Sequence, residues 1–173
     1  MVFIQVGKED FLFLIKMNHT KKVNHLSFYQ EYFHLLPNHL EIQGDQIISK
    51  FYEKNLSQVI PSISLLYSIL MCGLNVLNQI PFVTFSIDQI LIQDEEVGFS
   101  FGNGEFNTSA SPIECTQRFL KIIQNVYPLC TPVSSPLEKI MDQVLKLVVQ
   151  TKDEPRDAID WLVYIKDFIK NIM

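Results

Sequence analysis

Short apolar runs separated by polar turns mark the first hundred residues as rich in β-hairpins. Runs of this kind, joined by short turns that contain Gly or Asp, are typical of paired strands. Three pairs occur, namely Val2 to Val6 with Phe11 to Lys16, Leu40 to Ile42 with Gln46 to Tyr52, and Ile90 to Ile92 with Val97 to Phe101. We therefore expect a small antiparallel sheet near the N-terminus and a further hairpin near residues 90–101.

Apolar residues at helical spacing predict helices between and after these hairpins. They recur from Leu26 to Leu36 and again from Ile63 to Leu77, where Pro61 precedes the pattern. Two further helix starts are marked by Ser111 to Glu114 and by Ser135 to Glu138. Each places Ser at the N-cap, Pro at the first helical position and Glu at the third, which predicts a capping box.

The last helix is expected from Pro155 to Ile172, with Asp153 and Glu154 near its positively polarised N-terminus. Its expected apolar positions are Ile159, Leu162, Val163, Ile165, Phe168 and Ile169. Trp161 is expected to anchor the core or an interface. With strands concentrated early and helices late, the pattern predicts an α+β fold.

Composition narrows the class of protein. Of the 173 residues, 47% are hydrophobic and 19% charged, and the net charge is -5. This balance excludes a disordered chain and argues against binding of a nucleic-acid backbone, which needs a basic face. The apolar run from Ile63 to Leu77 is too short for a membrane span and is expected to be a buried helix. Cys72, Cys115 and Cys130 are odd in number, and no basic stretch precedes an apolar leader, so we expect an intracellular, cytoplasmic protein.

Candidate chemistry is sparse. No phosphate-binding loop motif or nucleophile motif occurs. Four histidines fall close together in sequence, but zinc needs closer ligand pairs and usually cysteine partners, so no metal site is expected; they are His19, His25, His34 and His39. Three successive acids, Asp94 to Glu96, are expected to form a solvated turn.

The order of the elements, and short segments within them, resemble a protein kinase in reduced form. Phe11 to Lys16 resembles the strand that ends in the family's nucleotide-contacting lysine, and Phe28 to Glu31 resembles the helix whose glutamate pairs with it. Leu66 to Asn78 is similar to the long helix before the catalytic loop, and Phe85 to Ile92 to the segment after the catalytic aspartate. Phe99 to Gly102 looks like the metal-binding Asp-Phe-Gly strand end.

Four more segments extend the resemblance over most of the chain. Ile47 to Glu53 is similar to the strand that leads into the hinge, and Asn55 to Ile60 to the short helix beyond it. Ser111 to Glu114 resembles the Ala-Pro-Glu element, and Lys152 to Ala158 resembles the late loop whose arginine pairs with that glutamate.

This resemblance implies a bilobal fold. Residues 1–54 would form a small β-rich lobe with one helix, and residues 55–173 a mostly helical lobe with the hairpin near residues 90–101. It also implies that Glu114 and Arg156 form an ion pair that ties two helices of the larger lobe.

The departures from the kinase pattern fall on the catalytic groups. Thr84 stands at the position of the catalytic aspartate, Gln89 at the metal-binding asparagine and Ser100 at the metal-binding aspartate, and the glycine-rich loop is absent. Phosphoryl transfer needs Mg²⁺ held by carboxylates, so the usual mechanism is not expected and no catalytic residue is assigned.

A nucleotide cleft would be formed by Lys16, Glu31 and Ser100. ATP is the one cofactor that the resemblance leaves open, and no Mg²⁺ is expected. The alternative is that Lys16 and Glu31 form a structural ion pair or never meet, and this alternative is slightly favoured because a nucleotide would lose most phosphate contacts.

The leading hypothesis is a catalytically inactive kinase-like domain, a pseudokinase, that binds another protein or serves as a scaffold. One alternative is a small atypical phosphotransferase that recruits metal through Asp88, Asp94, Glu95 or Glu96. The other is a non-kinase α+β adaptor subunit of a larger assembly. The partner and the oligomeric state stay open.

Overall fold

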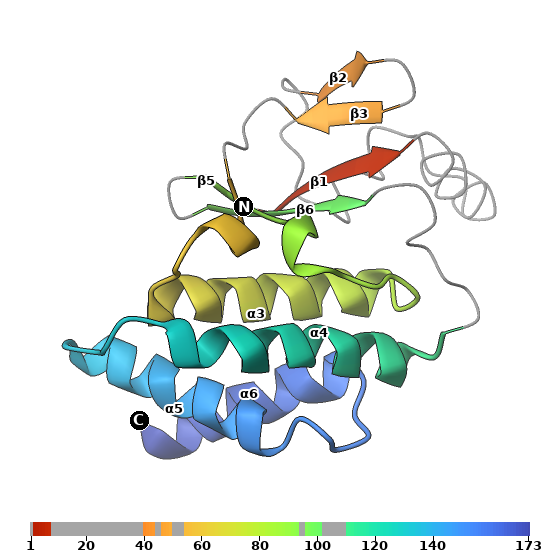
Figure 1. Ribbon diagram of the computed structural model, residues 1–173. Helices are drawn as coiled ribbons and strands as arrows, with labels where there is room; N and C mark the ends of the chain where they lie inside the picture. The colour runs from red at the N-terminus through yellow and green to blue at the C-terminus, as the bar shows by residue number, and fades with distance from the viewer. Residues whose placement is uncertain (1, 8–39, 44–45, 50–53, 94–95, 102–109) are drawn as a thin grey trace.

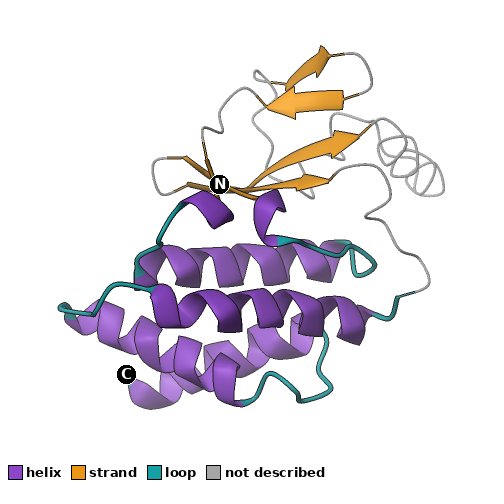
Figure 2. Ribbon diagram, viewed as in Figure 1, coloured by secondary structure: helices purple, strands orange, loops and turns teal. Residues whose placement is uncertain are grey.

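The computed structural model describes residues 2–7, 40–43, 46–49, 54–93, 96–101 and 110–173. Within them the protein is an α+β fold in which a β-sheet lies over a layer of α-helices (Figures 1 and 2). The predicted α+β class is therefore confirmed, whereas the kinase-like bilobal fold stays a prediction. No helix in this described part of the chain is long and apolar enough to cross a lipid bilayer.

Within the described residues, the sheet contains six strands in the order β2-β3-β1-β6-β5-β4. Their bounds are Val2–Gly7 for β1, Leu40–Gln43 for β2, Gln46–Ser49 for β3, Lys54–Asn55 for β4, Ile90–Gln93 for β5 and Glu96–Phe101 for β6. Strands β2, β3 and β1 form one antiparallel half, and β6, β5 and β4 form the other. The two halves are joined by parallel pairing of β1 with β6, which places Val2 opposite Val97 and Val6 opposite Phe101.

Two of the three predicted hairpins are confirmed. β2 and β3 pair with Gln43 opposite Gln46, and β5 and β6 pair with Gln93 opposite Glu96. In the first predicted hairpin, Val2 to Val6 does form a strand, but its expected partner, Phe11 to Lys16, lies outside the described residues, as does the helix expected from Leu26 to Leu36. Among the described strands, the neighbours of β1 are β3 and β6.

The parallel pair also links the two regions that the kinase resemblance separates at residues 54 and 55. The hairpin near residues 90–101 lies in the same sheet as the strands from residues 2–49. A division of the chain into two lobes stays a prediction.

Four α-helices are described, and each begins at or near a residue that the sequence pattern marks as a helix start. They are α3 (Ile63–Gln79), α4 (Pro112–Val126), α5 (Pro136–Gln150) and α6 (Ala158–Ile172). Short 3₁₀ turns occur at Leu56–Gln58 (η2), Ile87–Gln89 (η3) and Tyr127–Leu129 (η4). The capping box that opens α4 is confirmed, since Ser111 Oγ accepts from Glu114 N and a Glu114 carboxylate oxygen accepts from Ser111 N.

The start of α5 differs from the predicted capping box in one bond. Ser135 Oγ accepts from Glu138 N at 3.1 Å, as predicted. The carboxylate of Glu138 instead accepts hydrogen bonds from the Ser135 hydroxyl at 3.4 Å and from the Ser64 hydroxyl at 3.5 Å. Because Ser64 belongs to α3, this glutamate connects two helices instead of closing its own helix end.

The last helix begins later and faces the core differently than predicted. Its N-cap is Asp157, whose carboxylate accepts from Asp160 N at 3.0 Å, so the helix does not start at Pro155. Trp161 and Ile165 are fully buried, which confirms Trp161 as a core residue. Ile159 and Val163, two of the expected apolar positions, are 46% and 52% exposed and so do not belong to the buried face.

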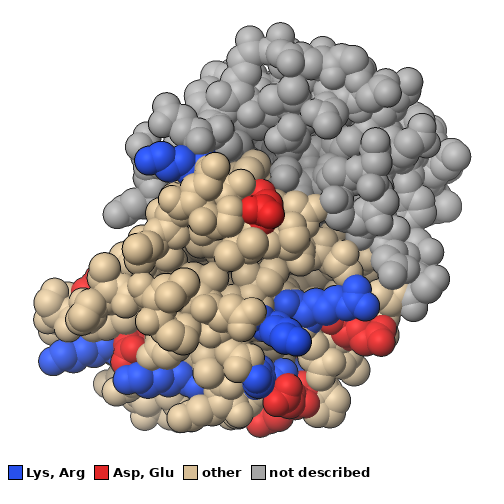
Figure 3. All heavy atoms as spheres, in the orientation of Figure 1, with Lys and Arg blue, Asp and Glu red and all other residues tan. Residues whose placement is uncertain are grey.

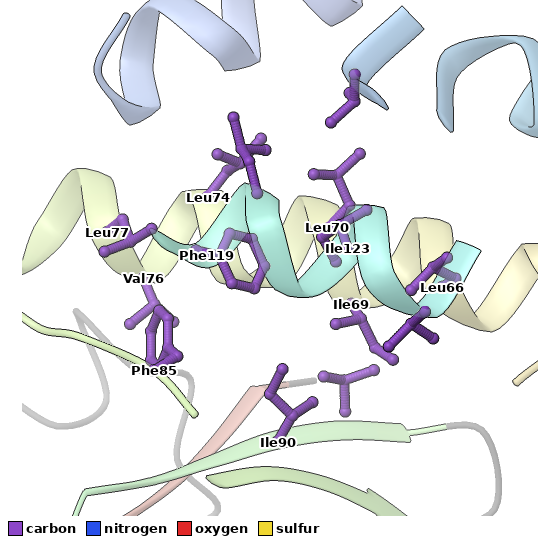
Figure 4. Packing of buried hydrophobic residues seen from close by; sticks show 14 of the residues in the cluster. Leu66, Ile69, Leu70, Leu74, Val76, Leu77, Phe85, Ile90, Phe119 and Ile123 are labelled. Atoms are coloured by element: carbon purple, nitrogen blue, oxygen red, sulfur yellow. The ribbon is translucent and has the colours of Figure 1, made fainter. Parts of the chain in front are cut away.

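The core is centred on α3, which lies between the sheet and the other helices (Figure 4). Its side chains alternate between Ile69 and Val76, which point toward the sheet, and Leu70 and Leu74, which point toward the helices. Both sets are buried, and each such side chain contributes roughly 1.5–3 kcal/mol to folding. The prediction that residues 63–77 form a buried helix is confirmed.

Candidate functional site

The predicted nucleotide cleft is described only at Ser100. This residue lies in β6 opposite Gln5 of β1, in the parallel pair at the centre of the sheet. Lys16 and Glu31 lie outside the described residues, so their pairing stays a prediction. The four histidines lie there too, and in the described part of the chain no three His, Cys, Asp or Glu side chains are grouped closely enough to hold a metal ion.

The segment that resembles the kinase catalytic loop connects the end of α3 to β5. Thr84 is half-buried between the buried residues Val83 and Phe85. Gln89 closes the short turn η3, because its side-chain oxygen accepts a hydrogen bond from Ser86 N. The side-chain amide of Gln89, which the kinase resemblance would place at a metal-binding position, therefore holds its own loop.

Aromatic packing fills the space beside this loop. The ring centroid of Phe85 is 4.8 Å from that of Phe99 in β6 and 5.4 Å from that of Phe119 in α4. Phe99 and Phe119 are fully buried, and tilted and edge-on aromatic pairs of this kind are favourable at such distances. The sheet, the loop and helix α4 thus meet through packed aromatic side chains.

Arg156 does not pair with Glu114, which corrects the prediction from the kinase resemblance. The guanidinium of Arg156 forms an ion pair with Glu154, two residues before it. Glu114 accepts from Ser111 N at 2.9 Å, and this hydrogen bond, with a second from the Ser111 side chain, lowers the pKa of the carboxyl below its usual value. Both charged groups therefore have local partners, although Nη1 of Arg156 is buried without a hydrogen-bond partner.

The guanidinium of Arg156 also lies over two aromatic rings of α6. Its central carbon is 3.8 Å from the centroid of the Tyr164 ring and 5.3 Å from that of Trp161. The two rings meet edge to face at 5.7 Å. Arg156 is therefore the residue that seats the loop between α5 and α6 on the last helix, through cation–π contacts that the sequence did not single out.

A polar groove runs beside α4. One wall is a single face of that helix, formed by Glu114, Gln117, Arg118, Lys121 and Gln124, and the other wall is Lys152 and Asp153 from the loop after α5. Its volume is about 310 Å³. Figure 3 shows Lys and Arg side chains next to Asp and Glu side chains over this part of the surface.

A second hollow, of about 330 Å³, lies at the far end of the helices. Within it, Tyr127 donates a hydrogen bond of 2.6 Å to Asp142, which also accepts from Lys146. Burial raises the pKa of Asp142, but the bonds from Lys146 and Tyr127 outweigh it and leave the pKa below its usual value. Burial, and then the hydrogen bond to Asp142, raises the pKa of Tyr127 well above its usual value.

Three free thiols complete the set of reactive side chains. Burial raises the pKa of all three, and that of Cys130, near the same hollow, to about 11. A thiol in this state is a weak nucleophile at neutral pH, because the thiolate is the reactive form.

Comparison with known proteins gives no assignment. No protein-family model, no curated protein and no solved structure matches this chain. The geometry described above, and the resemblance of the segments, therefore carry the functional argument.

Proposed function

We propose that this chain is a catalytically inactive, kinase-like module that acts by binding another protein. The proposal is supported by the order of described elements, in which a long helix, a loop, a hairpin and a capped helix follow one another. These are α3, η3, the β5–β6 hairpin and α4, in the order that the kinase resemblance requires.

The contacts of the loop between α3 and β5 are the main support for a lack of catalysis. Gln89, at the place of the metal-binding asparagine, uses its side-chain oxygen to accept from Ser86 N. Phe85, next to Thr84 at the place of the catalytic aspartate, packs on Phe99 and Phe119. The side chains of this loop therefore pack against the core or hydrogen-bond within the loop, whereas phosphoryl transfer requires polar groups that point toward metal and substrate.

Exposed apolar residues support a role in protein binding. Ile159 and Val163 are exposed and lie one turn apart on α6. Ile159 also lines a hollow of about 210 Å³, with Leu77, Pro81 and Pro112 among its other lining residues. Large apolar side chains at this spacing on one helix face are typical of contacts with a partner.

Incubation of the pure protein with labelled ATP and Mg²⁺ tests the catalytic part of this proposal. We expect no transfer of label to the protein or to a general acceptor such as casein. Autophosphorylation that disappears in Lys16→Ala would overturn the proposal and favour the atypical phosphotransferase. The matched control is Lys54→Ala, which removes an exposed lysine outside the predicted cleft.

Surface variants test the binding part. Ile159→Ser together with Val163→Ser removes the exposed apolar pair and leaves the buried face of α6 intact. We expect a protein that is enriched with the wild-type chain in quantitative affinity purification to be lost with this double variant. It should be retained with the control Lys166→Ser/Lys170→Ser, and equal enrichment with both variants would count against this surface.

A non-kinase α+β adaptor subunit is the second candidate, and the parallel pairing of β1 with β6 favours it. That pairing makes one sheet from strands that a bilobal fold would place in separate lobes. An adaptor subunit with faces normally covered by neighbours should self-associate when isolated. Light scattering that finds a stable monomer would argue against this second candidate.

A further inference from the structure

The polar groove beside α4 has the chemistry of a binding site for a negatively charged chain. Three of its lining side chains are cations, namely Arg118, Lys121 and Lys152. None of the three makes an ion pair with another residue in the described part of the chain, whereas Lys146, Arg156 and Lys170 do. Three unpaired cations around one hollow repel one another, so a bound anion would relieve a cost that the free protein carries.

The acids of the groove offset only part of this charge. The carboxylate of Glu114 accepts from Ser111 N and also interacts electrostatically with Arg118, and Asp153 is the second lining acid. Three lining cations and two lining acids leave a local charge of +1 in a protein whose net charge is -5, so a negatively charged partner would be attracted to the cations of this groove.

The dimensions of the groove fit a short extended segment. Its α4 wall runs from Glu114 to Gln124, which is about 15 Å at the rise of an α-helix. Four or five residues of extended peptide cover about that length. The amides of Gln117 and Gln124 both donate and accept, so they can hydrogen-bond the main chain of such a segment while the cations meet its carboxylates.

The opposite wall is held in place by its own hydrogen bonds. Glu154 N donates to Thr151 O at 3.0 Å, and Thr151 Oγ1 donates to Leu147 O at 2.8 Å. Arg156 pairs with Glu154 within this loop and contacts the ring of Tyr164 in α6. Lys152 and Asp153 are thus carried by a pre-ordered loop, which reduces the entropy lost on binding.

We propose that the groove formed by α4 and residues 152–153 binds a short acidic segment, rich in glutamate and aspartate, of a protein partner. Arg118, Lys121 and Lys152 attract the carboxylates of this segment, whereas the negative charge of Asp153 repels them. The inference deepens the proposed function, since it names the chemistry of one partner segment, and it rests on a protein-binding role. A nucleic acid is disfavoured because its backbone needs a longer, more strongly basic face.

Fluorescence anisotropy with synthetic peptides tests the proposal. The probe is a labelled heptapeptide of alternating glutamate and aspartate between terminal glycines, and its controls are the same peptide with glutamine and asparagine, a phosphoserine peptide and single-stranded DNA. We expect the acidic peptide to bind, the neutral one not to bind, and the affinity to fall as ionic strength rises, because exposed charge contacts are screened. Binding of only the phosphoserine peptide or only DNA would overturn the proposal, as would no binding at all.

Charge variants locate the contact. Arg118→Glu/Lys121→Glu should weaken binding about tenfold or more, while Asp153→Asn should strengthen it about twofold to threefold. The matched control is Lys139→Glu/Lys166→Glu, which reverses two exposed lysines outside the groove and changes the net charge equally. Equal losses in both double variants would overturn the proposal, because the effect would then come from net charge.

Circular dichroism on each variant confirms that folding is retained, and Lys152→Gln, at a loop position outside any helix, gives a second route if the helix variant unfolds. If the protein transfers no phosphoryl group and the acidic peptide does not bind, the proposed function is retained and only this inference is overturned.

Discussion

The ring of Phe119 in α4 lies directly on the backbone of Gly73 in α3. A Cβ atom added at Gly73 would be 2.1 Å from Phe119 Cζ and 2.6 and 2.7 Å from the two neighbouring ring carbons. Because Phe119 is fully buried and also packs on Phe85, the ring has little room to move. The absence of a side chain at residue 73 is therefore what allows α3 and α4 to approach this closely.

Gly73→Ala should destabilise the protein even though alanine is the better helix former. The gain in helix propensity is about 1 kcal/mol, whereas forcing an extra carbon into a packed core costs about 1–3 kcal/mol and here meets three ring atoms. We expect a lower midpoint in thermal unfolding followed by circular dichroism.

A double-mutant cycle with Phe119→Leu provides the control. The smaller side chain should make Gly73→Ala less costly than it is in the wild-type background, since the clash is with the ring. An alanine variant that unfolds at a higher temperature than the wild type would contradict the close approach.

The Tyr127–Asp142 hydrogen bond predicts a pH-dependent stability on the acid side. The pKa of Asp142 is lowered in the folded state, so its contribution is present above about pH 4 and is lost as the pH falls through the folded pKa. Asp142→Asn, which removes the carboxylate that Lys146 and Tyr127 hold, should therefore cost about 1 kcal/mol at pH 7 and almost nothing once the pH is below the folded pKa in urea unfolding. Asp167→Asn, in an exposed pair with Lys170, is the control and should have little effect at either pH.

Burial of Tyr127, together with the same hydrogen bond, predicts a loss of stability on the alkaline side. The pKa of Tyr127 is raised in the folded state, so its contribution is present below about pH 10 and is lost as the pH rises above that value toward the folded pKa. Tyr127→Phe should remove this part of the alkaline dependence in unfolding measured from pH 8 upward. An unchanged alkaline slope would show that the pKa of Tyr127 is not raised in the folded state.

Arg156 should be coupled to Tyr164 and not to Glu114. Replacement of Arg156 by Met keeps much of the apolar stem but removes the cation that lies 3.8 Å over the Tyr164 ring. The Arg156→Met/Tyr164→Leu cycle should give a coupling of about 0.5–1 kcal/mol in chemical unfolding. The Arg156→Met/Glu114→Gln cycle should give no measurable coupling, and a clear one would restore the kinase-like ion pair.

The cysteines should be slow to alkylate in the folded protein. Burial raises the pKa of each thiol, and that of Cys130 to about 11, so the reactive thiolate is scarce at pH 8. Cys130 should react with iodoacetamide roughly tenfold to a hundredfold more slowly than free cysteine, and all three should react readily in urea. Mass spectrometry of the labelled protein checks this, and a thiol that labels at the rate of free cysteine would contradict its burial.

Local patterns predicted the elements that local interactions form. Ser111 and Ser135 were assigned as N-caps because a serine followed by proline and glutamate satisfies the backbone groups at a helix start within four residues. The hairpins β2–β3 and β5–β6 followed from short turns between apolar runs, since neighbouring strands pair without a long connection.

The candidate site was predicted less well, because its contacts join distant segments. The kinase resemblance assigned Arg156 to Glu114, but the choice between Glu114 and Glu154 depends on where the loop after α5 lies. The groove beside α4 carried only a weak signal, the polar face from Glu114 to Gln124, because Lys152 and Asp153 join it only through the packing of α5 and α6.

The sequence by itself determined the capped starts of α4 and α5, the hairpins β2–β3 and β5–β6, the core position of α3 and the burial of Trp161, since these follow from capping chemistry, turn residues and apolar periodicity. Tertiary structure alone decided that β1 joins β6 in parallel, that Ile159 and Val163 stay exposed and that Phe119 covers Gly73. Such pairings bring together residues far apart in the chain, and their free energy depends on how all the surrounding elements pack at once.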